Sequence, residues 1–245
     1  MITRYRLTLG PVADHPLFPA SAYRLYAHLL ELLDEEAAFF LHEAAGRTIS
    51  QSLLPDRETG RTLWTIHLLT EETAGLLSPV LDTLTEVRIE NQVFPLLDRS
   101  RETVTAEDLI LRGRQEEHSC RRLRFQTLTS FRQGGRYVIF PQERLILQSL
   151  ILRWNEVFPR YPLADEDAFQ ALLAGLHIVD YSLRSGRFPL KGTRIPGFTG
   201  WCLLEAKLAL PLLELWNTLL LFGEYAGFGI KTGLGMGALL IEEQK

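Results

Sequence analysis

The order of patterned segments in the first half of the chain is the feature that most limits its fold. Segments in which apolar and polar side chains alternate, as in half-buried strands, are separated by longer segments with helical spacing of apolar residues. In chain order these are strand 2–9, helix 21 to about 43, strand 48–53, strand 61–69, helix 71–84 and strand 86–97. This βαββαβ order predicts an α+β fold of the ferredoxin-like (RRM-like) type, with two helices on one face of an antiparallel sheet.

The second half repeats this order less regularly. Strand-like segments at 121–128 and 137–140 precede helix-like segments at 143–158 and 165–176; alternating segments at 177–189 and 198–206, a helix at 208–222 and a final strand follow. A polar run at residues 112–118 separates the halves. We therefore expect two tandem ferredoxin-like units, an N-terminal domain at 1–115 and a less regular C-terminal domain at 116–245 that carries a glycine-rich loop.

That loop lies near the end of the chain, between a helix-like stretch and the last strand. Its members are Gly227, Phe228, Gly229, Lys231, Gly233, Gly235 and Gly237. Glycines permit sharp turns and close backbone approach, and backbone N–H groups beside a lysine suit a polyanion such as phosphate. The P-loop pattern fails because no strand-loop-helix order is present, and the Rossmann pattern fails for the same reason. A tight connection without a ligand is the alternative interpretation.

The charge of the chain is acidic overall but uneven. The net charge is −4, which does not favour nucleic-acid binding. Residues 112–136, however, contain seven arginines and two glutamates, and residues 184–194 contain four basic residues and no acid. Because arginine matches phosphate geometry, we expect RNA contacts from these stretches. The residues concerned are Arg121, Arg122, Arg124, Arg184, Arg187, Lys191 and Arg194. A solvated arginine face is the alternative.

Cysteine usage and hydropathy exclude other classes. Cys120 and Cys202 lie far apart without a paired-cysteine motif, which argues against a zinc site or a disulfide framework. The most apolar stretch, 208–222, is too short for a membrane span, and no signal pattern begins the chain. We expect a cytoplasmic protein that needs no metal or other cofactor.

The glycine-rich loop also follows a more specific pattern. It reads glycine, hydrophobe, glycine, then five residues that include Lys231, then glycine, hydrophobe, glycine. This resembles the C-terminal loop of the CRISPR-associated endoribonucleases of the RAMP superfamily, which cut precursor CRISPR RNA within its repeats. Further pieces agree in order along the chain: Leu41-His42-Glu43 with Ile49-Ser50, Phe140-Pro141 with 147–155, and Gly197 to Gly200. The resemblance implies two RRM-like units, CRISPR repeat RNA as ligand, and association with other CRISPR effector subunits.

Metal-free RNA cleavage needs a base for the 2′-hydroxyl, an acid for the leaving 5′-oxygen and a cation for the phosphorane, and histidine suits the first two roles. His28 and His42 both lie in the first helical region. On one unbroken helix they would stand about 21 Å apart. Asp34 offers an N-cap for a second short helix, which would let His42 fold back toward His28. Arg47 would then stand near the same phosphate, and Arg24 shares the helix face of His28.

The resemblance assigns roles to these residues. It implies that His42 is catalytic, that His28 or Tyr26 assists, and that Arg47, in place of the family's lysine, stabilises charge. His28 has a packed or capped alternative, His67 and His177 are expected to be structural, and His15 and His118 are expected to be exposed loop residues.

The function we expect is therefore a metal-independent endoribonuclease that leaves a 2′,3′-cyclic phosphate (or 3′-phosphate) and a 5′-hydroxyl. Two alternatives remain: a related subunit that holds guide RNA without cutting it, and a structural protein whose glycine loop is only a turn. Monomer and homodimer both stay open.

Overall fold

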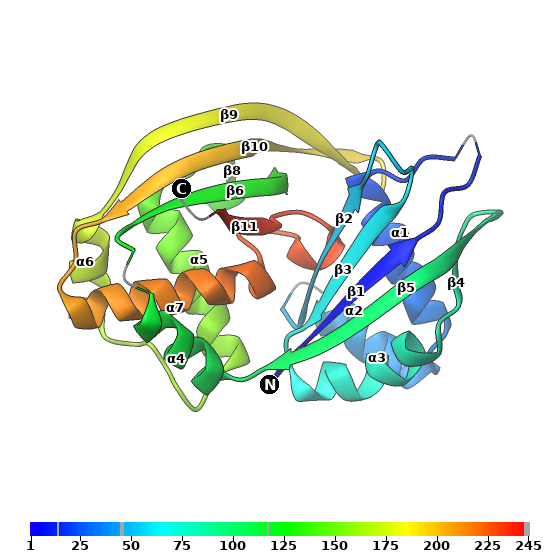
Figure 1. Ribbon diagram of the computed structural model, residues 1–245, viewed down its shortest axis with the longest axis horizontal. Helices are drawn as coiled ribbons and strands as arrows, with labels where there is room; N and C mark the ends of the chain where they lie inside the picture. The colour runs from blue at the N-terminus through cyan, green and yellow to red at the C-terminus, as the bar shows by residue number, and fades with distance from the viewer. Residues whose placement is uncertain (14, 45–46, 117, 243–245) are drawn as a thin grey trace. The chain divides into compact units, whose positions relative to one another are not determined.

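The computed structural model describes residues 1–13, 15–44, 47–116 and 118–242 (Figure 1). The chain divides into two compact units, each described here by itself. The N-terminal unit comprises Met1–Thr103 and Lys231–Met236, and the C-terminal unit comprises Val104–Ile230 and the chain from Gly237 onward. The short segment 231–236 of the glycine-rich loop thus belongs with the first unit.

The N-terminal unit has the predicted ferredoxin-like order. Its sheet runs β2-β3-β1-β5-β4, with strands β1 (Ile2–Leu9), β2 (Ile49–Pro55), β3 (Thr62–Leu68), β4 (Glu86–Ile89) and β5 (Gln92–Val104). Its helices are the 3-10 turn η1 (Pro19–Ser21), α1 (Ala22–Glu31), α2 (Glu35–Ala44), α3 (Glu71–Thr83) and the 3-10 turn η2 (Thr232–Leu234). The last predicted strand is a hairpin, β4–β5, which adds one edge strand to the four.

Alternation along the strands explains the core of this unit. Tyr5, Leu7 and Leu9 of β1 are fully buried and join Trp64 and Ile66 of β3 in one apolar cluster. Burial of large apolar side chains is the main favourable term in such a core.

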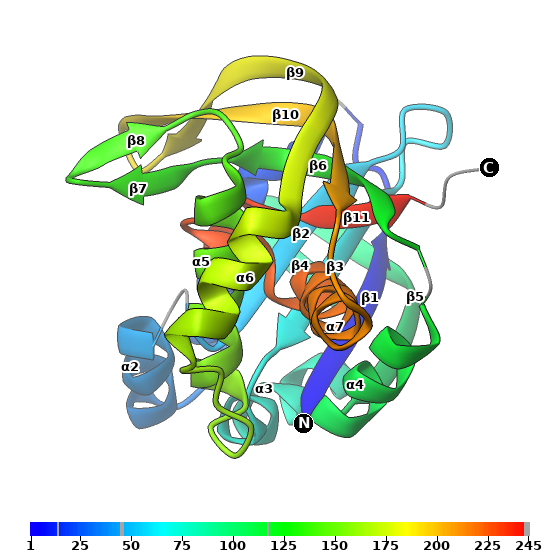
Figure 2. The same ribbon diagram turned by 90° about the vertical axis from the view of Figure 1, so that its left-hand side faces the viewer.

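The C-terminal unit repeats the topology. Its main sheet runs β11-β6-β10-β9, with β6 (Cys120–Thr129), β9 (Leu176–Leu190), β10 (Thr193–Ala206) and β11 (Leu239–Glu242), and β7 (Phe131–Gln133) and β8 (Arg136–Val138) form a separate hairpin. The helices are α4 (Ala106–Gln115), α5 (Glu143–Val157), α6 (Glu166–Gly175) and α7 (Leu210–Ala226). Helices α5, α6 and α7 lie on one side of this sheet (Figures 1 and 2). The second ferredoxin-like unit is therefore confirmed.

Helix α4 has no counterpart in the predicted elements. A capping box begins it, in which Thr105 and Asp108 satisfy each other's backbone N–H groups. Its Gly113 lies so close to α7 that an added Cβ would stand 2.1 Å from the Thr218 hydroxyl oxygen. Because α4 packs on α7, the contacts divide the chain between residues 103 and 104, whereas the polar run had suggested 115 and 116.

The hairpin β9–β10 is the longest element of the C-terminal unit. Strand β6 pairs with β10 only from Phe198 to Glu205, so residues 186–197 of the hairpin continue beyond β6. Its turn has positive φ at both central residues, 44° at Lys191 and 79° at Gly192, as a tight two-residue hairpin turn requires. Among the described residues no helix is long and apolar enough to span a membrane.

Candidate functional site

The first helical region is broken as the sequence predicts. Helix α1 ends at Glu31 and α2 begins at Glu35. The Asp34 carboxylate accepts a hydrogen bond of 2.8 Å from the Ala37 backbone N–H, and the Asp34 carbonyl accepts one of 2.9 Å from Ala38. Asp34 is therefore the N-cap of α2.

Tyr26 joins α1 to α2. Its hydroxyl donates a hydrogen bond of 2.9 Å to the Leu41 carbonyl oxygen, and both side chains are buried. Burial raises the pKa of the Tyr26 hydroxyl, so the group stays neutral. The Tyr26 hydroxyl thus links α1 to the end of α2, and its predicted assisting role stays a prediction.

His42 follows Leu41 in the last turn of α2 and faces solvent. Its side chain is 68% exposed, and its Nδ1 lies 3.6 Å from the Glu43 carboxylate. The backbone N–H of Arg47 donates to the Ala44 carbonyl at 3.0 Å. The Arg47 side chain is exposed and has no ion-pair partner among the described residues. An imidazole and a guanidinium thus stand at the same end of α2.

His28 and Arg24 lie on another side of α1. Residues two apart on a helix point to nearly opposite sides, so His28 faces away from Tyr26 and α2. His28 contacts Glu31 at 3.6 Å and lines an open cavity of about 570 Å³ with residues of α3 and β4, including Val80 and Arg88. Arg24 forms an ion pair of 2.6 Å with Glu90 beside β4. No contact between described residues joins His28 to His42, and their pairing stays a prediction.

The flanks of the glycine-rich loop pack inside the C-terminal unit. A Cβ at Gly229 would stand 2.2 Å from the Ser130 carbonyl oxygen, and one at Gly237 would stand 2.1 Å from the Phe228 carbonyl oxygen. The N–H groups of Gly229 and Gly237 donate to the Ser149 hydroxyl and the Leu128 carbonyl, respectively, at 3.1 and 3.0 Å. Phe228 is fully buried. The glycines here permit close backbone packing, and these two N–H groups are occupied.

The centre of the loop belongs to the N-terminal unit. The side-chain amide of Gln51 on β2 donates to the Gly233 carbonyl at 2.7 Å, and the Trp64 indole N–H donates to Gln51 at 2.8 Å. Lys231 has positive φ, 59°, and its carbonyl accepts from Leu234 and Met236. The loop is fixed to β2, and the Lys231 side chain is exposed. Gln51 was absent from the predicted site, because only the folded sheet brings it to a segment 182 residues away.

The first predicted basic stretch is engaged in contacts within the C-terminal unit. Arg121 is buried and forms an ion pair with Glu116. Arg122 stacks over the Trp201 ring, with 4.3 Å from the guanidinium carbon to the ring centre. Arg124 is exposed and forms an ion pair with Glu242. Each of these three arginines already contacts a partner side chain within the C-terminal unit.

The side chains of the second predicted basic stretch are exposed and form no ion pair with another described residue. Arg184, Arg187, Lys191 and Arg194 on hairpin β9–β10 are all exposed. The register places Arg187 opposite Pro196 and Arg194 opposite Pro189, so both arginines lie on one face of the hairpin. None of the four forms an ion pair within the part of the chain that the structure describes. The hairpin is therefore a basic ribbon.

The remaining histidines lie where the sequence indicates, with one exception. His67 is buried, its Nδ1 lies 3.0 Å from the Ser50 hydroxyl, and burial lowers its pKa to about 3, with Arg4 and Arg6 adding to the effect. His15 and His118 are exposed loop residues. His177 begins β9 but is exposed on this edge strand, so it is not a core residue.

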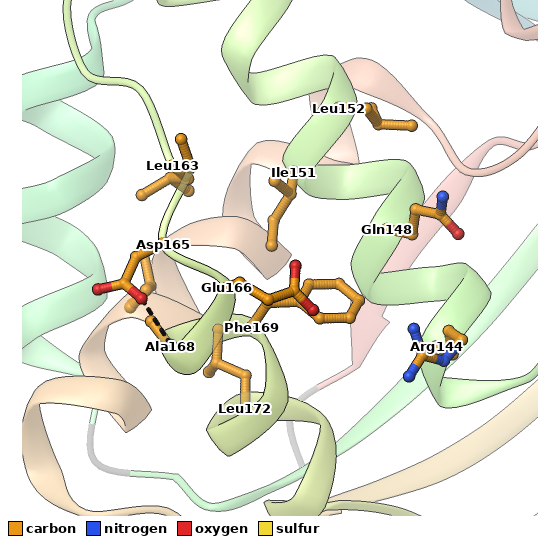
Figure 3. A pocket seen from close by; sticks show the side chains of 12 residues that line it. Arg144, Gln148, Ile151, Leu152, Leu163, Asp165, Glu166, Ala168, Phe169 and Leu172 are labelled. Carbon is orange, nitrogen blue, oxygen red and sulfur yellow. Dashed lines mark hydrogen bonds between the residues drawn. The ribbon is translucent and has the colours of Figure 1, made fainter.

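One further cavity lies away from these residues, between α5 and α6 (Figure 3). Its volume is about 280 Å³, and its walls include Ile151, Leu163 and Phe169, with the Arg144 guanidinium 5.4 Å from the Phe169 ring centre. Asp165 and Glu166 stand at its edge. This apolar, partly acidic lining does not suit a phosphate backbone. No group of three or more metal-binding side chains gathers anywhere in the described residues.

Known proteins resemble this chain in sequence and in fold. The family described as "CRISPR-associated endoribonuclease Cas6" matches residues 123–239. A curated protein of that name from Streptococcus thermophilus is 30% identical over 234 residues, which cover 95% of each chain. A solved Cas6 product complex has a TM-score of 0.80 at 23% identity, covering 99% of this chain and 100% of the other. A second one has a TM-score of 0.77 at 26% identity and covers 99% of both chains.

Proposed function

The chain belongs to the Cas6 family of CRISPR-associated endoribonucleases, and we propose that it cuts precursor CRISPR RNA within its repeats to give mature guide RNAs. The observation that carries the proposal is the placement of His42. The Asp34 cap and the Tyr26 hydrogen bond to Leu41 hold this histidine in solvent at the end of α2. An exposed histidine that is fixed through its backbone suits proton transfer to or from a bound substrate.

The proposed chemistry needs no metal ion. The ribose 2′-oxygen attacks the adjacent phosphorus and loses its proton, while the bond from phosphorus to the 5′-oxygen breaks and that oxygen gains a proton. The products are a 2′,3′-cyclic phosphate and a 5′-hydroxyl. His42 performs one of the two proton transfers as a general base or general acid. Tyr26 holds its helix in place.

Two cations of the N-terminal unit suit the charge that develops on the phosphorane. Arg47 stands just after α2 with an exposed side chain, and its guanidinium keeps its charge throughout. Lys231 is exposed on the glycine-rich loop, which Gln51 fixes to β2. Fixed cations near a developing anion lower the barrier because they need not reorganise during the reaction.

The basic ribbon on β9–β10 supplies the RNA contacts of the C-terminal unit. Its four cations are exposed and not neutralised by acids of the described chain, so they are available to phosphates. Arg121, Arg122 and Arg124 contribute less, because each already contacts a partner side chain.

The direct test is incubation of the protein with labelled repeat RNA in EDTA, beside the same RNA with a single 2′-deoxy nucleotide at the cut position. We expect the first RNA to be cut, leaving a cyclic phosphate and a 5′-hydroxyl, and the second to remain intact. Cleavage of the 2′-deoxy RNA would contradict 2′-hydroxyl attack, and cleavage only after addition of a divalent cation would contradict metal independence. Tight binding without cleavage of either RNA would support a non-catalytic subunit.

A further inference from the structure

Three of the exposed aromatic side chains of the C-terminal unit come from neighbouring elements. Tyr137 of β8 is 46% exposed, Phe140 just before α5 is 42% exposed, and Tyr181 of β9 is 55% exposed. We call these three residues the aromatic patch. Large aromatic rings normally contribute to a core, so three exposed rings from neighbouring elements indicate a binding surface.

The patch is held in place by its neighbours. The rings of Phe140 and Tyr181 meet edge to face, with centres 5.2 Å apart and an interplanar angle of 88°. The Glu143 carboxylate at the start of α5 accepts a hydrogen bond of 2.9 Å from the Ile178 N–H, which ties α5 to β9. Tyr137 precedes Phe140 by three residues, about 10 Å of extended chain. The rings of Phe140 and Tyr181 thus form one surface, and Tyr137 lies near them along the chain.

The hairpin β7–β8 adds positive charge beside these rings. Arg132 pairs directly across from Tyr137 and shares its face of the hairpin, whereas Arg136, which precedes Tyr137 on β8, lies on the opposite face. Both arginines are exposed and make no ion pair with another described residue. Figure 2 shows this hairpin beside β9 and β10, and contacts join β8 to β10. Of the nearby acids, Glu143 holds the Ile178 N–H and Asp180 accepts from the Tyr181 N–H.

We propose that the aromatic patch binds an unpaired segment of RNA, whose bases stack on Tyr137, Phe140 and Tyr181 while Arg132 contacts the phosphates. Stacking on aromatic rings combined with arginine contacts to the backbone is how proteins hold single strands. An apolar surface without surplus charge would favour a protein partner, whereas here Arg132 adds positive charge on the face of Tyr137. The inference rests on the proposed function only in taking RNA as the ligand.

The test uses fluorescence anisotropy of a labelled, unstructured uridine-rich RNA of about ten nucleotides, a length within the usual range for single-strand sites. We expect Phe140→Ala and Tyr181→Ala each to weaken binding by at least roughly fivefold, and the double variant by more. Tyr181→Trp and Phe140→Trp should retain binding, because they keep an aromatic ring. A 4-thiouridine RNA should cross-link to peptides that contain patch residues.

The matched control variants lie on α5 and beyond the far end of this helix. Leu152→Ala removes an exposed apolar side chain from α5, and Arg160→Ala removes an exposed arginine past the end of α5, a helix about 22 Å long. Neither should weaken binding more than twofold. Unchanged affinity of the folded Phe140→Ala, Tyr181→Ala double variant, or an equal loss in the controls, would overturn the proposal.

The experiments distinguish a failure of the proposed cleavage function from a failure of the patch proposal. If the wild-type protein does not cut repeat RNA but loses single-strand affinity on patch substitution, the patch proposal stands without the proposed function. If the protein cuts repeat RNA while the patch variants bind the unstructured RNA as the wild type does, only the patch proposal is overturned.

Discussion

The two ferredoxin-like units share their strand order but differ in the two connections that matter for RNA. In each unit the first crossover includes two helices, α1–α2 in one and α5–α6 in the other, where the hairpin β7–β8 precedes them. Helix α2 is followed by a loop that contains Arg47, whereas α6 ends at Gly175 and β9 begins at Leu176 without a loop. The hairpin strands β2 and β3 have 7 residues each, while β9 and β10 have 15 and 14.

The comparison shows which parts of a shared fold carry the candidate functional residues. The N-terminal unit has its exposed histidine and guanidinium at the end of a crossover, and the C-terminal unit has its free cations on an extended hairpin. Loops and hairpin tips tolerate such additions because the core does not depend on them. We therefore expect chemistry to depend on the first unit and RNA affinity on the second.

The largest effect should come from the hairpin β9–β10. Replacing Arg184, Arg187 and Arg194 together by alanine should weaken repeat-RNA binding roughly 50-fold at 0.15 M salt and reduce the salt slope by about 2, because each phosphate contact contributes about 0.7. Titrations at several salt concentrations measure both quantities. In the matched pair of single variants, Arg187→Ala should weaken binding and Arg124→Ala should not. Equal losses would contradict the distinction between free and paired arginines.

The N-terminal unit should be the more sensitive to acid. Burial lowers the pKa of His67 to about 3, below its ordinary value near 6.5, so between these pH values the unfolded chain binds a proton that the folded unit does not. The stability is complete above pH 6.5 and falls with decreasing pH, by about 2 kcal/mol at pH 5. Denaturant unfolding between pH 5 and 7.5 measures this slope. His67→Gln should flatten it; an unchanged slope would contradict the assignment.

Replacing Arg121 should lower the free energy of unfolding and leave the RNA affinity unchanged. It is buried and forms an ion pair with the half-buried Glu116, whose backbone carbonyl also accepts from the Asn217 side-chain amide at 2.8 Å. Arg121→Met keeps apolar bulk and should cost about 1–2 kcal/mol of unfolding free energy, because Glu116 loses its partner. Denaturant unfolding of the variant checks the predicted loss of stability, and RNA titration of the same variant checks the unchanged affinity. A large loss of affinity in the folded variant would place Arg121 among the RNA ligands.

The smallest effect concerns the tip of the basic ribbon. Lys191 holds a positive φ that asparagine adopts more readily. Lys191→Asn should therefore stabilise the hairpin by about 0.5–1 kcal/mol and weaken RNA binding about fourfold through the lost cation. In the variant, the free energy of unfolding should rise while the affinity for RNA falls. If both move together, the lysine is not kept at this position for its charge.

The sequence predicted the fold largely because periodicity is local. Strand and helix order in both units, and the Asp34 cap, could be derived from neighbouring residues. Helix α4 was missed because its polar residues resemble a linker, and its packing on α7 joins segments far apart in the chain.

The site was harder to predict. The break after α1 reorients α2, so spacing along the chain could not show that His28 faces β4 and α3. Ion pairing depends on contacts such as Arg124 with Glu242, 118 residues apart, so exposed and engaged arginines look alike in sequence. The exposed aromatic patch was missed for the same reason, since Phe140 and Tyr181 meet only in the fold.

The central claim is that His42 transfers a proton during cleavage. Its direct test is the single-turnover cleavage rate of His42→Ala at saturating protein, measured with the dissociation constant for the same repeat RNA. We predict a rate loss of about 10²–10⁴-fold with an unchanged dissociation constant, while the exposed His177→Ala control cuts at the wild-type rate. Cleavage by His42→Ala at the wild-type rate would contradict the account.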